Sequence, residues 1–577
     1  MDETTSYPPI EPSNFDLIVV GTGLPEAILA AAASAAGKSV LHLDPNPSYG
    51  SHYASLPLQE FTTYIESHSS QSSANLPIPQ SDMDSGFTRV PLTTRPLYSS
   101  VEITSYSLEP LEQSRKFNVD LSGPRVLLCA DAMIDLILKS EVNQYMEFKS
   151  IDGSFISDGE GNLESVPDSR SAIFKDRKLS FTEKNQLMRF FKLVQGHLEA
   201  AAAADGGESS ESKSISEQDL ESPFVEFLSK MGLSAKLKSY RSNRLSLSVS
   251  HSFLFSAIPF CFRIVLYAIA MAEYDQENGD VCKSVLKTKN GIDRLALYHS
   301  SVGRFPNAPG AMIYPIYGQG ELPQAFCRRA AVKGCIYVLR MPVNSLLMDK
   351  ASGSYKGVCL ASEQELFSHK LILAPSFVVQ LPLPHSSPDA HDFGSRNATE
   401  KLARSICISK HSLKLDVANC LAFFPPRSLF PEQVTAIHVL QLSSNVAVCP
   451  SGMFLTYLSA ICEDDVQGKK LLHAAINVLF HVPVSGISGN NNNFAEDQSE
   501  TGDAKPALLW SVLYTQELAK FQDVLDNIIR TPMPDGSPYY HDLLGATEKI
   551  FQELYSGEEF FPKSTSPEEG AAQELED

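Results

Sequence analysis

The chain has 577 residues, of which 43% are hydrophobic and 20% charged, so it is long enough to form two or more domains with cores of their own. Its formal net charge of −21 argues against a nucleic-acid-binding role, because such proteins need a basic surface that neutralises phosphates. The ten cysteines are spread thinly and form no C-x-x-C pair, which argues against a disulfide framework or a zinc site. The first residues, Met1-Asp2-Glu3, lack the features of a signal peptide, so we expect a cytosolic protein.

The N-terminal segment has the pattern of a strand, a glycine-containing turn, a helix and a second strand. Residues 15–20 form an apolar run that ends at Gly21. Residues 25–36 are rich in alanine and are followed by Gly37, and residues 40–44 are apolar again. This order predicts a βαβ unit of the dinucleotide-binding type.

The turn of this unit departs from a working dinucleotide fingerprint. Gly21, Gly23 and, after the second strand, Asp44 stand where such a fingerprint needs them. The third glycine position, however, holds Glu26, whose charge and bulk should repel a pyrophosphate. The residues therefore support the fold strongly and the cofactor poorly. An equally good interpretation is that the two glycines merely form a tight turn. Asp44 would then merely cap the end of a strand or bind solvent.

The rest of the chain alternates between structured and soft segments. We expect the first part of the dinucleotide-type domain at 1–165, a helical domain at 166–295, the second part of the first domain at 296–562 and an acidic disordered tail at 563–577. Three segments are expected to be flexible because of their composition. They are the Ser-, Thr- and Pro-rich residues 51–113, the Ala run followed by Ser, Glu and Lys at 199–222, and the Asn-rich residues 485–505.

One apolar window, residues 252–272, has about the length of a membrane span. Arg263 lies near its middle, where a charge costs roughly 2.5–3.5 kcal/mol on the insertion scale. Pro259 also lies inside the window and cannot continue a helix. We therefore expect no membrane helix here and interpret the window as an accident of joining residues 240–263 to the apolar helix that follows them.

Residues 314–328, YPIYGQGELPQAFCR, predict a tight turn followed by a helix. Gly318 and Gly320 permit the turn, and Pro323 suits the first turn of a helix. Helical spacing then separates an apolar stripe from a polar stripe. The apolar stripe comprises Leu322, Phe326 and Ala330, and the polar stripe comprises Glu321, Gln324 and Arg328. The spacing alone leaves open whether the polar stripe binds a partner or only faces solvent.

The N-terminal run DLIVVGTGLPEAILAAAASAAGKSVLHLDPNPSYG resembles the Rab GDP-dissociation inhibitor and Rab escort protein superfamily. The Gly-x-Gly-Leu-x-Glu form and the pair Tyr49-Gly50 carry the resemblance, although Ser51 stands where the family usually has a second glycine. The resemblance implies an α/β fold. Its larger domain is a dinucleotide-binding (FAD/NAD(P)-type) βαβ domain of the GDP-dissociation-inhibitor type, and its smaller second domain is all-helical. It also implies no cofactor, because this superfamily does not use the flavin.

Residues 314–328 match the Rab-binding platform of the same superfamily. By that match, Tyr49, Glu321, Gln324 and Arg328 contact the switch regions of a Rab GTPase. Ile336 stands at a further platform position where related inhibitors carry a hydroxyl residue. Residues 453–455, Met-Phe-Leu, match the region that binds the C-terminal tail of Rab, although an ordinary core role is an equally good interpretation of each of them.

The escort branch is favoured by the length of the chain and by two further segments, residues 166–188 and 506–510. An escort protein binds newly made GDP-bound Rab and presents it to the α/β heterodimer of Rab geranylgeranyltransferase. It then shields the geranylgeranyl lipid, takes prenylated Rab to a membrane and catalyses nothing itself. The alternatives are a Rab GDP-dissociation inhibitor without a transferase role and a flavin-dependent oxidoreductase of the amine oxidase type.

Residues 240–263 interrupt a segment that is one continuous helix in the superfamily. Because that helix faces the transferase, an insert containing Pro259 puts transferase binding in doubt. We interpret the insert as a retained intron or a gene-model error. Transcript sequencing across the junction tests this interpretation, which a dominant mRNA that includes the insert would contradict.

Overall fold

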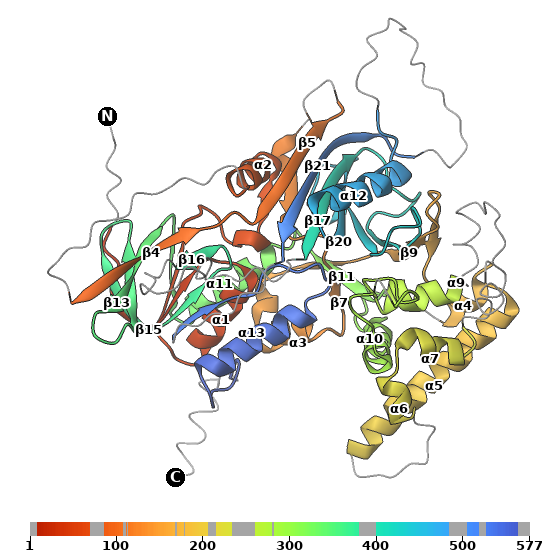
Figure 1. The fold of residues 1–577 in the computed structure, drawn as a ribbon, viewed down its shortest axis with the longest axis horizontal. Coiled ribbons are helices and arrows are strands. Elements are labelled where there is room, and N and C mark those ends of the chain that lie inside the picture. The colour runs from red at the N-terminus through yellow and green to blue at the C-terminus, as the bar shows by residue number, and fades with distance from the viewer. Residues whose placement is uncertain are drawn as a thin grey trace, which may run out of the picture.

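The computed structural model describes residues 8–69, 86–107, 111, 113–167, 170–177, 179–205, 215–233, 260–279, 282–379, 400–483, 505–518 and 527–562. These residues form two large β-sheets with helices packed around them, and a group of helices lies at one end of the molecule (Figure 1). The mixed α/β class that the N-terminal pattern predicts is therefore confirmed.

The first sheet contains the predicted βαβ unit. Its strand order is β12-β2-β1-β15-β14-β13-β4-β16, with β22 beside β15. The parallel part comprises β1 (Asn14–Val20), β2 (Val40–Asp44), β12 (Ile336–Leu339), β15 (Glu365–Leu373) and β22 (Ile528–Arg530). The antiparallel part comprises β4 (Phe87–Thr94), β13 (Val343–Asp349), β14 (Tyr355–Leu360) and β16 (Phe377–Val379). β1 and β2 lie inside the sheet and are buried on both faces, by helices on one and by side chains of the antiparallel strands on the other, which explains their continuous apolar runs.

Three helices pack together beside the first sheet: α1 (Leu24–Ala35), α11 (Glu321–Val332) and α13 (His541–Leu554). α1 lies against both of the others, and its small side chains allow the close approach (Figure 1). The alanine run that predicts a helix thus also makes α1 the centre of this layer. Helix α1 packs between α11, from the middle of the chain, and α13, from near the end of the chain.

The second sheet has the order β10-β9-β18-β19-β20-β17-β21-β5. Its strands are β5 (Tyr98–Ser105), β9 (Gly153–Ser157), β10 (Leu163–Ser165), β17 (Lys401–Ser409), β18 (Cys420–Phe424), β19 (Ile437–Ser443), β20 (Phe454–Cys462) and β21 (Leu508–Glu517). Helix α12 (Asp465–Leu479) packs against this sheet. The smaller elements are α2 (Leu58–Ser67), α3 (Ala132–Lys139), β3 (Ser55–Pro57), β6 (Asn118–Asp120), β7 (Leu127–Leu128), β8 (Phe148–Ser150) and β11 (Met312–Pro315).

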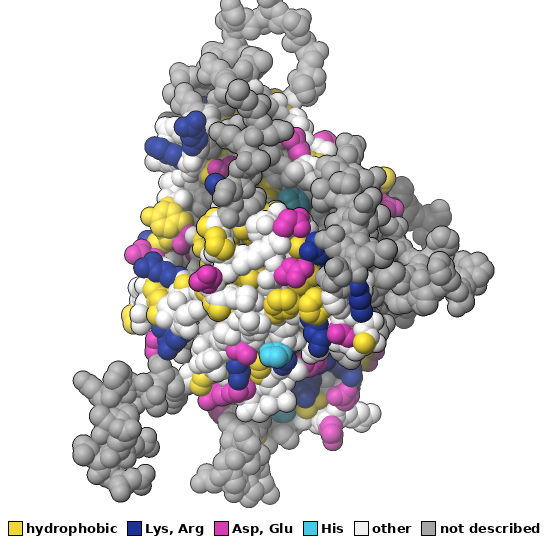
Figure 2. Space-filling model, turned by 90° about the vertical axis from the view of Figure 1, so that its left-hand side faces the viewer, with side chains coloured by type: hydrophobic (Ala, Val, Ile, Leu, Met, Phe, Trp, Pro, Cys, Tyr) yellow, Lys and Arg dark blue, Asp and Glu magenta, His cyan; other side chains and the backbone are white. Residues whose placement is uncertain are grey.

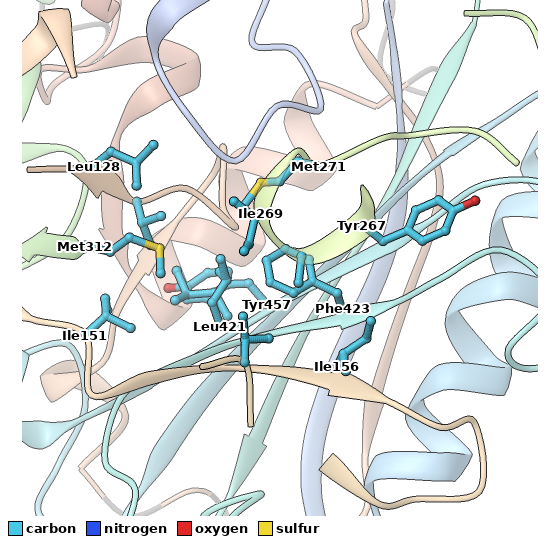
Figure 3. Close-up of a cluster of buried hydrophobic side chains, with 14 of the residues drawn as sticks. Leu128, Ile151, Ile156, Tyr267, Ile269, Met271, Met312, Leu421, Phe423 and Tyr457 are labelled. Atoms are coloured by element: carbon cyan, nitrogen blue, oxygen red, sulfur yellow. The ribbon is translucent and has the colours of Figure 1, made fainter. Parts of the chain in front are cut away.

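The helices at the end of the molecule are α4 (Arg170–Lys175), α5 (Phe181–Asp205), α6 (Glu217–Glu221), α7 (Phe224–Lys230), α9 (Phe260–Arg263), the π-helical turn η5 (Ile264–Ile269) and α10 (Thr288–Ser301). η5 connects them to the second sheet. Figure 3 shows Tyr267 and Ile269 of η5 and the adjacent Met271 beside Leu421 and Phe423 of β18, all of them buried. The helical region therefore shares one hydrophobic core with the second sheet.

Two of the three segments expected to be flexible contain regular structure. Within residues 51–113, α2 forms because Leu58, Phe61 and Ile65 line one buried face, and β4 and β5 are rich in the β-branched residues that favour strands. Within residues 199–222, α5 continues through the alanine run to Asp205, because alanine is the best helix former, and α6 follows. Residues 206–214, 240–259, 484–504 and 563–577 lie outside the described residues, so the expectations for these parts remain untested.

Charged side chains of both signs are interspersed with hydrophobic ones on the face that Figure 2 shows. Ion pairs such as Arg89–Glu365, at 3.0 Å, connect separate strands, here β4 and β15 of the first sheet. Among the helices of the described part, none is both long and apolar enough to span a bilayer.

Candidate functional site

The turn between β1 and α1 is held together by Asp44 at the end of β2. Asp44 is fully buried, and its Oδ2 accepts hydrogen bonds from Thr22 N at 2.8 Å, Thr22 Oγ1 at 2.6 Å and Ser51 Oγ at 2.9 Å. Its Oδ1 accepts from Asn46 N at 2.8 Å. Gly21 has a φ of 103°, which only glycine adopts without strain. Both carboxylate oxygens of Asp44 thus bind the protein's own donors, and neither is offered to a ribose.

Glu26 occupies the space at the N-terminus of α1 where a pyrophosphate would lie. The side chain is 1% exposed, its Oε1 accepts a hydrogen bond from Thr531 Oγ1, and its Oε2 lies against Gly23. Burial raises the pKa of Glu26 to about 7. A helix N-terminus attracts anions, but here a carboxyl group of the chain itself fills that position. The residues at this turn therefore do not fit a dinucleotide cofactor.

We expect the substitution Glu26→Gln to make the chain more stable at pH 8 but not at pH 4.5. The folded-state pKa of about 7 lies above the ordinary value of 4.5, so the folded chain binds the proton more tightly. The resulting stability is complete below pH 4.5 and is lost as the pH rises through 7. At pH 8 the free energy of unfolding of the glutamine variant should exceed that of the original chain by on the order of 3 kcal/mol.

Chemical denaturation of both chains at the two pH values measures this difference. Glu60→Gln, at an exposed position of α2, is the matched control and should show no such dependence on pH. If Glu26→Gln and the original chain differ in stability by the same amount at both pH values, the raised pKa of Glu26 is contradicted.

The turn before α11 is held in place by hydrogen bonds to Asp120, at the end of β6. Asp120 is 1% exposed, and its Oδ1 accepts from Ser55 Oγ at 2.5 Å and from Gln319 N at 3.0 Å, while its Oδ2 accepts from Tyr314 Oη. Ser55 Oγ in turn accepts from Gly320 N at 2.7 Å. Burial raises the pKa of Asp120 to about 6. An added Cβ at Gly320 would lie 2.5 Å from Ser55 N, so the turn can approach β3 only with glycine at this position.

Helix α11 separates its two stripes as the sequence predicts. The apolar stripe, Leu322, Phe326 and Ala330, is fully buried. On the polar stripe, Gln324 and Arg328 are exposed and Glu321 is half-buried. Burial raises the pKa of Glu321. One face of the helix therefore anchors it to the core, and the other leaves its polar groups accessible.

The polar side chains of α11 are held in position from within the chain. The Arg328 guanidinium lies over the ring of Tyr145, 4.7 Å from its centroid, which is a favourable cation–π arrangement. Gln324 Nε2 lies 3.5 Å from Glu321 Oε1. These contacts restrict the rotamers before any partner binds, so less conformational entropy is lost on binding.

Tyr49 lies at the edge of the same cluster of buried side chains as the apolar stripe of α11. Its ring meets that of Tyr337 edge-on, with centroids 5.9 Å apart, and burial raises its pKa. Ile336 begins β12, pairs with Leu41 of β2 and is half-buried. Tyr49 is thus brought beside α11, whereas Ile336 is a strand residue at the edge of the first sheet.

The segment expected to receive a Rab tail begins β20. Met453 and Phe454 are half-buried, and Leu455 is fully buried. The first two side chains therefore retain accessible surface, while Leu455 belongs to the core.

Two parts of the site could not be predicted from the sequence. Tyr145, which supports Arg328, comes from a separate 3₁₀ turn, Val142–Tyr145. Asp120 is separated from Gln319 by 199 positions and from Ser55 by 65 positions. No local pattern connects residues so far apart, and a pattern within one segment cannot indicate which distant carboxylate it will bind.

Comparisons with known proteins agree with this geometry. The family model described as GDI, GDP dissociation inhibitor, matches residues 11–77, 80–279 and 283–499. Rab escort protein 1 of Arabidopsis thaliana is 52% identical over 588 residues, covering 100% of this chain and 99% of that protein. Rab proteins geranylgeranyltransferase component A 1 of Homo sapiens is 24% identical, covering 97% of this chain and 93% of that protein.

Among solved structures, the crystal structure of a Rab GDI from Plasmodium falciparum superimposes with a TM-score of 0.60. It shares 18% sequence identity and covers 94% of this chain and 99% of that one, which supports the fold. The resemblance inferred from the turn and from α11 is confirmed by the family model and by the 52% identity. The chain belongs to the GDP dissociation inhibitor family, in its Rab escort protein branch.

Proposed function

We propose that this chain binds newly made GDP-bound Rab GTPases, prenylated or not, through Tyr49, Glu321, Gln324 and Arg328, which we call the platform. The observation that carries the proposal is the polar face of α11, held in fixed positions by Tyr145 and by the anchored turn. The family is an accessory and non-catalytic one, and the turn at Glu26 does not fit a flavin. An oxidoreductase is therefore not a competing proposal.

The chain then presents Rab to the α/β heterodimer of Rab geranylgeranyltransferase and shields the attached lipid. Relatives that carry the printed name of component A of that enzyme support the first step. Each buried CH₂ of a geranylgeranyl chain contributes about 0.8 kcal/mol, so shielding requires apolar surface, which we place in the helical region between α4 and α10. The complex moves through the cytosol and meets membranes transiently.

Reconstitution tests the proposal. Unprenylated Rab, the transferase and labelled geranylgeranyl diphosphate are combined with and without this chain, and labelled Rab is expected only with it. Equal labelling in both mixtures would contradict the escort role. Binding of prenylated Rab alone, without any stimulation of labelling, would favour a Rab GDP-dissociation inhibitor.

We expect Arg328→Ala to weaken the binding of GDP-bound Rab by about 1–3 kcal/mol, the cost of losing a charge-assisted hydrogen bond. Arg328 is exposed and is not needed for the buried face of α11, so the melting temperature should stay close to that of the original chain. Isothermal titration calorimetry measures the affinity. Lys333→Ala, an exposed cation at the end of the same helix, is the charge-matched control and should bind normally. Unchanged affinity of Arg328→Ala would remove Arg328 from the platform.

A further inference from the structure

Tyr317 stands in the turn before α11 in a backbone conformation that a tyrosine adopts at a cost. Its φ is 75°, in the left-handed region where glycine and, less often, asparagine and aspartate are found. Such a conformation is energetically unfavourable for tyrosine and persists only where the surroundings impose it. The sequence does not indicate a positive φ at Tyr317. It suggests that conformation only at the glycines of this turn, Gly318 and Gly320.

Three hydrogen bonds impose this conformation. Tyr317 N donates to Val446 O at 2.9 Å, and Tyr317 O accepts from Asn118 Nδ2. Gly318 N closes the turn onto Pro315 O at 3.2 Å. The backbone of Tyr317 is thus attached to β6 and to the segment before β20.

The Tyr317 side chain points outward. It is 56% exposed, whereas Tyr314, three positions earlier, is fully buried and donates to Asp120. Among the contacts of the described residues, no hydrogen bond of the Tyr317 hydroxyl and no ring contact of its side chain is present. Hydrogen bonds thus hold the strained backbone of Tyr317, whereas its exposed ring makes no such contact within the described residues.

We propose that Tyr317 is an additional contact residue for the bound GTPase and that its ring packs on an apolar patch of that protein. The inference rests on the proposed Rab binding and adds a residue that the resemblance does not assign. Exposed, rigid aromatic side chains dominate the energetics of many interfaces, because they bury a large area at little cost in rotamer entropy. Residues held in sparsely populated backbone conformations are also found preferentially at functional sites.

The position of Tyr317 fixes the kind of surface that it can meet. The residue lies four positions before Glu321, and the intervening turn is pinned to Asp120 and Ser55. The offset between the backbone of Tyr317 and the polar stripe is therefore fixed. The matching surface of the GTPase must place an apolar patch beside groups that complement Glu321 and Arg328.

The test compares affinity with stability, because the two should respond in different ways to Tyr317→Gly. Glycine relieves the positive φ but makes the unfolded chain more flexible, so the melting temperature should change by no more than about 2 °C. The Kd for GDP-bound Rab should rise by about tenfold or more, as expected for the loss of an aromatic anchor. Tyr317→Phe should bind within about twofold of the original chain, since the ring and not the hydroxyl makes the contact.

Two controls separate this inference from the proposed function. Asp416→Gly removes another exposed residue with a positive φ, of 59°, in the loop after β17, and should bind Rab normally. Arg328→Ala reports on the platform itself. If Arg328→Ala weakens binding while Tyr317→Gly binds as the original chain does, the inference about Tyr317 is wrong and the platform stands. If the original chain binds no Rab at all, the proposed function fails.

A second substitution covers the case in which Tyr317→Gly destabilises the turn. Tyr317→Asn keeps a side chain that tolerates the left-handed region but removes the ring. Its Kd should rise as in Tyr317→Gly, and an Asn variant that binds like the original chain overturns the inference.

Discussion

Asp120→Ala is expected to lower the free energy of unfolding by about 4 kcal/mol and to weaken Rab binding at the same time. The substitution leaves three buried or half-buried donors, Ser55 Oγ, Tyr314 Oη and Gln319 N, without their acceptor. An unsatisfied buried group costs about 1–3 kcal/mol, and the three donors share one site, so their costs do not simply add. Binding falls because the start of α11 loses its attachment to β6.

Urea denaturation measures the first effect, and titration with GDP-bound Rab measures the second. Asp416→Asn, at an exposed loop position whose left-handed backbone asparagine also tolerates, is the control and should change the unfolding free energy by less than about 0.5 kcal/mol. Asp120→Asn keeps one acceptor oxygen, so its loss of unfolding free energy should lie between that of Asp120→Ala and that of the control. A loss below about 1 kcal/mol in Asp120→Ala would mean that the turn holds its shape without the carboxylate.

The pH adds a further check on Asp120. Burial raises its pKa from 3.8 to about 6, so the folded chain binds the proton more tightly than the unfolded one. Stability from this group is complete below pH 3.8 and is lost as the pH rises through 6. The stability gap between the original chain and Asp120→Asn should therefore shrink between pH 4 and pH 7.

What the sequence predicts correctly are the features that depend on local spacing. The βαβ unit follows from apolar runs between Gly21 and Asp44, and the two stripes of α11 follow from the period of a helix. The position of Glu26 beside the helix N-terminus also follows from the spacing of the fingerprint. Its partner does not, because Thr531 lies 505 positions further along the chain.

Composition alone misleads in the segment 51–113. Its Ser, Thr and Pro residues suggest flexibility, but Thr is also a strand former, and β4 and β5 use it in that way. Sheet membership depends on partners that the segment does not contain. β4 pairs with β13, and β5 pairs with β21 near the end of the chain. A local pattern cannot reveal a strand that is stabilised by such distant neighbours.

The second large effect is expected at Asp535, in the segment that links β22 to α13. Its carboxylate is the partner of Arg125, whose side chain is fully buried, and its backbone O accepts from both Arg125 Nη2, at 3.1 Å, and Arg404 Nη2, at 3.0 Å. Arg404 is only 1% exposed. Two buried guanidinium groups thus meet at one residue, and the carboxylate of Asp535 offsets part of their charge.

Asp535→Ala should lower the free energy of unfolding by about 3–5 kcal/mol, because it leaves buried positive charge without its carboxylate. Arg125 keeps its bond to Tyr539 O, at 2.8 Å, so the guanidinium remains in place but is no longer neutralised. Denaturation in urea gives the loss. Asp542→Ala removes the same charge from an exposed position at the start of α13 and should cost less than about 1 kcal/mol.

The same segment also contacts the turn before α11, which makes Asp535→Ala informative about binding. Tyr540 Oη donates to Gln319 Oε1, and Gln319 Nε2 donates to Arg125 O at 2.7 Å. Displacement of the segment should therefore loosen the turn before α11 and raise the Kd for GDP-bound Rab, although less than Asp120→Ala does, since Asp120 binds that turn directly. A variant that loses stability but binds Rab with unchanged affinity would show that the platform is held by Asp120 and Ser55 alone.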